Sequence, residues 1–328
     1  MASVIDPNRL SGVLAPVLTP FDRMLAPDAK RFVAFARVLL GLDIGLAPFG
    51  TTSEGNSLSV AEKIELLDAL AAAGADMGRV MPGTGTCALS DTVALTSRAV
   101  RLGCGGVLML PPFYYKGVND DALFRSYSEV IQRVGESRLR VYLYHFPRQS
   151  QTPLSLGLIA RLLKAYPGVV AGIKDSSGEF ANMAAMVRAF PGLQVFTGTE
   201  ALMLDLLRIG GAGCISANAN VNGAAMVELY RRWREPEAEG FQEALTAFRV
   251  ATQDFPAIPL LKALLSRACG DQNWRLTRPP LLDLSIDAED AAAKRLALAG
   301  FPVGWRRPPL SGGQPSAASA RAIWDSAS

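Results

Sequence analysis

Eight short runs of apolar or β-branched residues recur along the first two thirds of the chain, and segments with helical spacing separate them. The runs cover residues 12–21, 44–52, 79–86, 106–115, 140–147, 169–177, 194–200 and 213–219. Strands that alternate with helices in this way predict βα units and a parallel sheet. Because the runs are almost continuously apolar, they are typical of strands covered on both faces. Eight such units favour an α/β fold of the (β/α)8 TIM-barrel type over an open, doubly wound sheet.

The segment SVAEKIELLDALAAAG shows how clearly the sequence marks a helix. Ser59 and Glu62 have the S-x-x-E spacing of a capping box, and Leu58 stands at the hydrophobic-staple position. Gly74 suits the site just after a helix end, where a positive φ favours glycine. Residues 59–74 are therefore expected to contain a helix with both ends specified.

Beyond about residue 222 the strand pattern stops and long segments with helical periodicity follow. The pattern of residues 227–270 predicts helices, and a further helix is expected to begin at Asp287 and to end at Gly300. The last residues are rich in Pro, Gly, Ser and Ala, a composition typical of mobile ends. The sequence thus predicts one domain in three parts: the barrel in 1–222, a C-terminal helical extension in 223–302 and a flexible tail in 303–328.

The charge balance argues against a polyanionic partner. Lys and Arg total 33 against 30 Asp and Glu, which gives a formal net charge of +3, and no basic stripe is visible. We therefore expect neither nucleic acid nor a membrane surface as a partner. The first residues lack a basic segment followed by an apolar one, and no run approaches about 18 apolar residues, so neither a signal peptide nor a membrane span is expected. The four cysteines are scattered without a C-x-x-C pair, which favours free thiols in a cytoplasmic protein.

The inventory of side chains argues against several kinds of catalysis. The chain has one histidine, His145, and no cluster of cysteines, so a metal site built on imidazole or thiolate ligands is disfavoured. A Ser-His-Asp triad would have to use the same histidine, and no G-x-S-x-G motif accompanies it. Neither G-x-G-x-x-G nor G-x-x-x-x-G-K-[ST] follows a predicted strand. We therefore expect neither a metal ion nor a cofactor.

One lysine stands at the end of an apolar run. Residues 169–173 lead directly to Lys174, and the chain then turns polar. Lysine is rarely buried without a partner, and the functional groups of a (β/α)8 barrel cluster where its strands end. Burial disfavours the ammonium form of a lysine, and a neutral amine attacks a ketone to form an imine, which then serves as an electron sink. Lys174 at the mouth of the barrel is therefore our candidate for a nucleophile that needs no cofactor.

A structural interpretation of Lys174 stands beside this one: an ion pair with Asp175 or Glu54 at the strand end. The buried placement alone does not separate the two interpretations. We interpret His145, Glu54 and Glu200 as structural residues, and general-base catalysis is the alternative for the two glutamates. Five other lysines lie on predicted amphipathic helices, where a solvent-exposed face explains them: Lys30, Lys63, Lys164, Lys262 and Lys294.

Imine formation and the loss of water both move protons, so this chemistry requires a proton shuttle. Tyr144, one predicted strand away from Lys174, could be that shuttle, and Thr51 could relay protons to it from across the barrel. Each has a structural alternative, the tyrosine as an aromatic that fills the barrel end, and Thr51 with Thr52 as the end of a strand. The GTTSEG turn could also offer backbone N–H groups to a carboxylate.

Seven motifs resemble, in order and spacing, those of the dihydrodipicolinate synthase / N-acetylneuraminate lyase family. They are GTTSEG (50–55), PPFYYK (111–116), YLYHFP (142–147), GIKDSSGE (172–179), TGTE (197–200), GGAGCISANANV (210–221) and PAIPLLKALL (256–265). The likeness covers about residues 10–285. It implies a (β/α)8 barrel with a C-terminal helical extension, usually assembled as a homotetramer that is a dimer of dimers. It also implies a class I aldolase mechanism on a small-molecule partner, pyruvate or a related 2-keto acid.

The resemblance also implies roles for particular residues. Lys174 matches the Schiff-base lysine, and Tyr144 matches the tyrosine that shuttles protons and contacts the substrate. Thr51 matches the first relay threonine, and Thr52 helps to hold the keto-acid carboxylate. Tyr115 matches a tyrosine that family members insert across a subunit interface to complete the relay. Two backbone positions that line the substrate pocket are matched by Gly198 and Ile215.

Two departures weaken an assignment to lysine biosynthesis. Gln149 stands five residues after Tyr144, where biosynthetic members usually have an arginine that organises carboxylate binding, and Arg148 comes one residue early. Ser53 stands where the GTTGE motif has glycine. We therefore expect a lyase for a longer 2-keto acid, in first place a 2-keto-3-deoxy sugar acid aldolase or dehydratase. The alternatives are 4-hydroxy-tetrahydrodipicolinate synthase and, from another class, a barrel that binds keto acids without catalysis.

Overall fold

The computed structural model describes residues 9–301, and the tail predicted in 303–328 lies outside them. Seven strands form one parallel sheet in the order β2-β1-β7-β6-β5-β4-β3. They are β1 (Gly12–Ala15), β2 (Gly45–Leu46), β3 (Val107–Met109), β4 (Val141–His145), β5 (Val170–Asp175), β6 (Gln194–Thr197) and β7 (Gly213–Ile215). Isolated bridges join residues 80–83 to β2 on one side and to β3 on the other. The sheet therefore closes into a barrel with eight members, as predicted.

The strands are shorter than the apolar runs that predicted them, and proline accounts for much of the difference. Pro16 follows β1, and Pro48 lies two residues beyond β2. Proline has no N–H to donate to a ladder, so strands end near it. In the third member, Pro82 only accepts, from the Leu108 N–H at 2.9 Å, which explains why residues 80–83 form bridges and not a regular strand.

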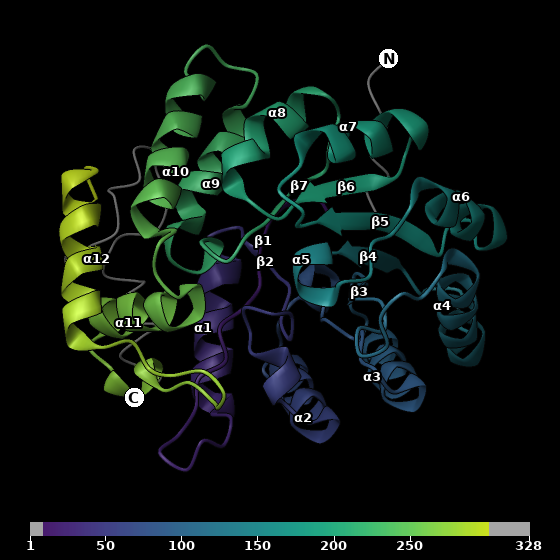
Figure 1. Cartoon of the computed structure of the whole chain (residues 1–328). Coiled ribbons are helices and arrows are strands. Elements are labelled where there is room, and N and C mark those ends of the chain that lie inside the picture. The colour runs from purple at the N-terminus through teal and green to yellow at the C-terminus, as the bar shows by residue number, and fades with distance from the viewer. Residues whose placement is uncertain (1–8, 302–328) are drawn as a thin grey trace.

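Helices cover the outside of the barrel, and three more gather on one side of it, at the left of Figure 1. The covering helices are α1 (Ala29–Gly41), α2 (Val60–Ala72), α3 (Leu89–Arg101), α4 (Asp120–Val134), α6 (Leu156–Ala165), α7 (Phe180–Ala189), α8 (Met203–Arg208) and α9 (Ala219–Arg232). The short helix α5 (Pro147–Ser150) follows β4 directly and lies inside this ring, near the centre of Figure 1. The C-terminal extension holds α10 (Ala238–Thr252), α11 (Ala257–Cys269) and α12 (Ile286–Leu298). The predicted boundary at residue 222 falls inside α9, at a kink at Asn222.

Helix ends agree with the sequence where a capping box marks them and differ where it does not. Ser59 caps α2, with both hydrogen bonds of the capping box present, and Gly74 has a φ of 74°. The expected start of α12 at Asp287 was wrong by two residues. Ser285 is its N-cap, because the Ser285 hydroxyl accepts a hydrogen bond from the Ala288 N–H at 3.3 Å.

The barrel interior is filled by side chains from every one of its eight members. They are Leu14, Ala47, Met81, Leu108, Tyr142, Tyr144, Ala171, Phe196, Ala212 and Ile215. Tyr142 fits because its neighbours have no side chain. A Cβ on Gly106 or Gly172 would lie 2.5 or 2.7 Å from the Tyr142 ring. The alternate residues Val141 and Leu143 face outward and pack among the surrounding helices.

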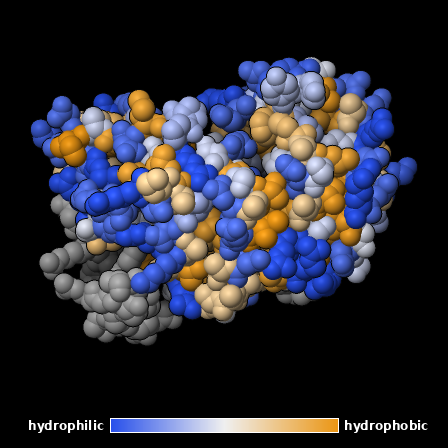
Figure 2. Space-filling model, turned by 90° about the horizontal axis from the view of Figure 1, so that it is seen from below, coloured by the Kyte–Doolittle hydropathy of each residue, from blue (hydrophilic) through white to orange (hydrophobic). Residues whose placement is uncertain are grey.

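Over the face seen in Figure 2, hydrophobic residues are interspersed with hydrophilic ones. Within residues 9–301 no helix combines the length and the apolar character that crossing a bilayer requires. The four cysteines carry free thiols, as the sequence predicted.

The N-terminus of α2 makes the fold sensitive to acid. Glu62 accepts hydrogen bonds from the Ser59 N–H at 2.8 Å and from the Arg278 guanidinium at 2.5 and 2.9 Å. The hydrogen bonds from Arg278 lower the pKa of Glu62 from 4.5 to about 2. Because the pKa is lower in the folded chain, this carboxylate stabilises the fold above about pH 4.5, and its contribution is lost as the pH falls towards 2.

We therefore expect Glu62→Gln to lower the Tm near neutral pH, with a difference from the unchanged protein that shrinks between pH 4.5 and about 2. Thermal unfolding across this pH range measures it. Glu65→Gln, at an exposed position of the same helix, is the matched control and should leave the pH profile unchanged. A difference for Glu62→Gln that stays constant with pH would contradict the prediction.

Candidate active site

Lys174 and Tyr144 lie side by side at the carboxyl ends of two adjacent strands. Tyr144 of β4 and Lys174 of β5 are register partners in the parallel ladder. The Lys174 Nζ donates a hydrogen bond to the Tyr144 Oη at 3.3 Å and lies 4.4 Å from the centre of its ring. The two residues are only 6% and 5% exposed. The structure thus brings together the predicted nucleophile and the predicted proton shuttle in a buried site.

The alternative interpretation of Lys174, as a structural ion pair, was wrong. The Asp175 carboxylate accepts from the Ser177 N–H at 2.7 Å and from the Asn182 amide at 2.8 Å. The Glu54 carboxylate pairs with Lys262 instead. Among the residues that the structure describes, Lys174 therefore has Tyr144 as its hydrogen-bond partner and no carboxylate.

The prediction that Lys262 and Lys63 lie on solvent-exposed helix faces was also wrong. Lys262 is fully buried in α11, and Lys63 is 4% exposed in α2. Burial lowers the pKa of both ammonium groups, although Glu54 opposes the effect at Lys262 and Asp91 opposes it at Lys63. Helical spacing alone could not reveal this, because segments distant in sequence cover these faces.

Thr51 and Thr52 follow β2, so they lie at the same end of the barrel as Lys174. Both are half-buried, and neither side chain makes a hydrogen bond within residues 9–301. Their turn is held through its backbone. The Thr51 carbonyl accepts from the Glu54 N–H at 3.1 Å, and the Ser53 carbonyl accepts from the Thr19 hydroxyl at 2.7 Å. The structure therefore contains no direct bond between Thr51 and Tyr144, and their relay stays a prediction.

Tyr115 lies in the loop after β3 and is 75% exposed. Its ring meets that of Tyr114 edge-on, with 5.4 Å between the centroids, and Tyr114 is equally exposed. The structure does not join Tyr115 to Lys174 or Tyr144, and the interface role implied by the resemblance stays a prediction.

The two predicted pocket positions lie at the carboxyl ends of β6 and β7, the two members that follow β5 in the sheet. Gly198 follows β6, and its N–H donates to the Asp175 carbonyl at 2.7 Å. A Cβ on Gly198 would lie 2.2 Å from the Ser176 hydroxyl oxygen, so this close approach requires glycine. Ile215 ends β7 and belongs to the same interior cluster as Tyr144.

His145 and Glu200 have structural contacts, as predicted. The His145 Nδ1 accepts from the Leu154 N–H at 3.1 Å, and burial lowers the pKa of this imidazole. Glu200 is buried, accepts from the Asn218 amide at 2.6 Å and from the Ser216 hydroxyl, and lies 3.6 Å from Arg249. Both residues hold the loops around the barrel mouth together.

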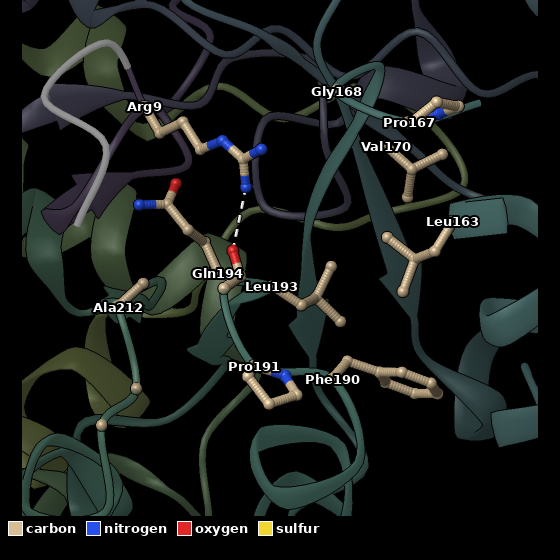
Figure 3. A pocket seen from close by; sticks show the side chains of 13 residues that line it. Arg9, Leu163, Pro167, Gly168, Val170, Phe190, Pro191, Leu193, Gln194 and Ala212 are labelled. Carbon is tan, nitrogen blue, oxygen red and sulfur yellow. Dashed lines mark hydrogen bonds between the residues drawn. The ribbon is translucent and has the colours of Figure 1, made fainter. Parts of the chain in front are cut away.

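A cavity of about 400 Å³ lies at the other end of the barrel. Val170 and Gln194, which begin β5 and β6, line it, and Arg9 donates to the Gly192 carbonyl at 2.9 Å (Figure 3). Because this cavity lies at the amino ends of the strands, opposite Lys174, we do not assign it to the site. Within the described residues no three His, Cys, Asp or Glu side chains gather so as to hold a metal ion.

Comparison with known proteins identifies the family. The chain matches the model of the dihydrodipicolinate synthetase family over residues 9–299. It is 32% identical over 290 residues to a protein of Chloroflexus aurantiacus described as an uncharacterized DapA-like lyase, with 87% of this chain and 95% of the relative covered. It is 30% identical over 314 residues to a 4-hydroxy-tetrahydrodipicolinate synthase of Synechococcus sp., with 90% and 97% covered.

A solved structure supports the same assignment. The crystal structure of dihydrodipicolinate synthase from Agrobacterium tumefaciens is similar to this fold with a TM-score of 0.80 and 29% sequence identity, and the match covers 88% of this chain and 99% of that one. The chain belongs to the dihydrodipicolinate synthetase family, whose members are lyases.

Proposed function

We propose that the protein is a Schiff-base lyase in which the amine of Lys174 condenses with the carbonyl group of a 2-keto acid. One observation carries the proposal: the buried Lys174 Nζ lies 3.3 Å from the Tyr144 Oη at the carboxyl ends of adjacent strands. An amine and a phenol at this separation can exchange protons directly or through the atom that reacts with the amine.

The proposed reaction begins when Nζ attacks C2 of the keto acid, and the former carbonyl oxygen takes up a proton to give a carbinolamine. That oxygen then leaves as water, and a protonated imine remains on Lys174. In cleavage, the C4 hydroxyl loses its proton, C4 leaves as an aldehyde, and the imine accepts the electron pair of the C3–C4 bond to become an enamine. Protonation of the enamine at C3 restores an imine, and hydrolysis by water then releases pyruvate and the free amine. In a condensation or dehydration, the imine instead accepts the electron pair of the C3–H bond as C3 loses its proton, and hydrolysis after the new bond has formed or the C4 hydroxyl has left releases the product keto acid. Tyr144 supplies and removes the protons in these steps.

The substrate that we propose is a 2-keto-3-deoxy sugar acid, which the enzyme cleaves or dehydrates. Two residues support this. Gln149, in place of the arginine expected in a biosynthetic synthase, is exposed on α5 beside Arg148, and Ser53 replaces the glycine of the threonine turn. A site without that arginine has one fixed partner fewer for a second carboxylate, which a 2-keto-3-deoxy acid with a hydroxyl group at its far end does not carry.

Trapping with borohydride tests the reaction class. After incubation with pyruvate and reduction, we expect one adduct, located by peptide mass spectrometry on Lys174. Lys63 and Lys262 serve as internal controls, because both are buried but neither is paired with a tyrosine hydroxyl. An adduct elsewhere, or none, would contradict the proposal.

A second candidate, 4-hydroxy-tetrahydrodipicolinate synthase, is favoured by the relatives of that name at 30% identity. A substrate panel separates the two. Pyruvate with aspartate semialdehyde should give the higher kcat/KM if the protein is this synthase, and 2-keto-3-deoxy acids should do so if our first proposal holds.

We also propose that the enzyme is a cytoplasmic homotetramer, a dimer of dimers. Four free thiols support the compartment. The adjacent exposed rings of Tyr114 and Tyr115 support a subunit interface at the loop after β3, where a neighbouring subunit would cover them.

A further inference from the structure

A buried ion pair links the C-terminal extension to the turn that carries Thr51 and Thr52. The Nζ of Lys262, from α11, pairs with the carboxylate of Glu54, and both side chains are fully buried. Lys262 also donates to the Leu276 carbonyl at 2.6 Å and lies 4.3 Å from the centre of the Phe21 ring. These contacts place the ammonium group of Lys262 beside Glu54, in the turn that carries Thr51 and Thr52, which we call the threonine turn.

Arg278 forms a second link between the same two segments. Its backbone N–H donates to the other oxygen of the Glu54 carboxylate at 2.8 Å. Its guanidinium donates to the Ser57 carbonyl at 2.7 Å and to both carboxylate oxygens of Glu62 at the start of α2. The extension therefore holds the chain at Glu54, at Ser57 and at Glu62, directly after the threonines.

The turn itself is strained and needs such support. Glu54 has left-handed backbone angles, with a φ of 55°, which costs free energy for a residue other than glycine. Its N–H donates to the Thr51 carbonyl, and the Gly55 N–H donates to the Gly50 carbonyl at 3.0 Å. The side chains of Thr51 and Thr52 make no hydrogen bond within the described residues, so no such bond holds their hydroxyls in place independently of the backbone of this turn.

We propose that Lys262 and Arg278 are positioning residues, which act through Glu54 to hold Thr51 and Thr52 at the barrel mouth. The extension is then part of the catalytic apparatus and not only a cover for the barrel. This inference rests on the proposed function, in which the two threonines meet the keto acid. It also gives a reason for the buried pair other than stability, because replacing such a pair by apolar residues of similar volume is often neutral or stabilising.

The test uses the double variant Glu54→Gln/Lys262→Met, which removes both charges together and avoids leaving either one buried and unpaired. We expect it to stay folded, with kcat reduced roughly 10- to 100-fold and a raised KM, because small displacements of positioning groups cost rates of this order. The adduct on Lys174 should still form. Hydrogen exchange should become faster in a peptide that contains the Glu54 and Gly55 amides and stay unchanged in one from β5.

Single variants separate positioning from stability. Lys262→Met alone should lower the Tm more than the double variant does, while both show a similar loss of kcat. Glu289→Gln is the matched control, because this buried carboxylate pairs with Arg275 within the extension and does not touch the turn. It should lower the Tm and leave kcat unchanged.

The inference is overturned if the double variant keeps the kcat and the exchange rates of the unchanged protein, or if Glu289→Gln loses as much kcat. An unchanged protein that forms no pyruvate adduct would defeat the proposed function. Whether the pair holds the turn is then still decided by the exchange of the Glu54 and Gly55 amides.

Discussion

Lys174→Ala is expected to abolish turnover, with a loss of at least about 10⁴-fold in kcat and no adduct after borohydride reduction. In the proposed reaction the substitution removes the nitrogen that forms the imine, so no slower version of this covalent route remains. The fold should survive, because Lys174 hydrogen-bonds to Tyr144 and pairs with no carboxylate within residues 9–301. Lys174→Met, which keeps most of the side-chain volume, should be equally inactive and at least as stable as Lys174→Ala.

Lys164→Ala is the control for this experiment, since Lys164 is exposed on α6 and has no part in the site. Steady-state assays, thermal unfolding and trapping should show it unchanged. Two results would contradict the assignment. Turnover above about one per cent in Lys174→Met would show that another group is the nucleophile. Unfolding of both Lys174 variants would show that the lysine has a structural purpose after all.

The sequence sufficed to predict that Lys174 lies at the barrel mouth, because this placement depends on the local pattern of apolar residues. A lysine that closes an apolar run must lie at the end of a buried strand, and in a parallel barrel all such ends meet at one mouth. The same reasoning placed Tyr144 beside it, since the two residues end consecutive predicted strands. The register of β4 and β5 then makes them direct partners.

Lys262 shows where this reasoning stops. Its helix has an ordinary apolar spacing, and a lysine on such a helix is normally solvated. The side chain is buried only because Glu54 and Phe21, more than 200 positions earlier in the chain, lie against it. Contacts of this kind are set by how α11 packs onto the barrel, which no local spacing encodes. The strands are shorter than predicted for a different reason: prolines inside the apolar runs cannot donate a hydrogen bond to the ladder, and the strands end near them.

The barrel interior suggests how the site keeps its geometry. Tyr142 and Tyr144 are two residues apart on β4 and so face the same side of the strand. Both rings point into the barrel, and Tyr142 lies one layer further from the mouth. The lower tyrosine is fixed by hydrogen bonds from the Leu10 N–H and to the Gln194 side chain, both at 3.0 Å. The upper one stacks on Phe146, with 5.8 Å between the ring centroids, and points its hydroxyl at Lys174. One tyrosine therefore serves the scaffold, and we propose that the other serves the reaction.

Because we propose a role in the reaction for Tyr144, Tyr144→Phe should cause the second large loss of kcat. The change removes one oxygen and keeps the ring, so the stacking on Phe146 and the packing around Lys174 should persist. We expect kcat to fall by roughly 10²- to 10⁴-fold, the range for loss of a general acid–base group. The pyruvate adduct should still form on Lys174, because the nucleophile remains. It should form more slowly, because no phenol is left beside the amine to donate and accept protons.

Tyr142→Phe is the matched control, since it removes the same atom from the same strand one layer further from the mouth. It should cost about 1–3 kcal/mol of stability, because the Leu10 N–H and Gln194 lose a buried partner. Its kcat should stay within about threefold of the unchanged enzyme, since its hydroxyl lies away from Lys174. If Tyr142→Phe and Tyr144→Phe lost kcat alike, the phenol of Tyr144 would be a packing group, and the proton shuttle would have to be sought among Thr51 and Tyr115.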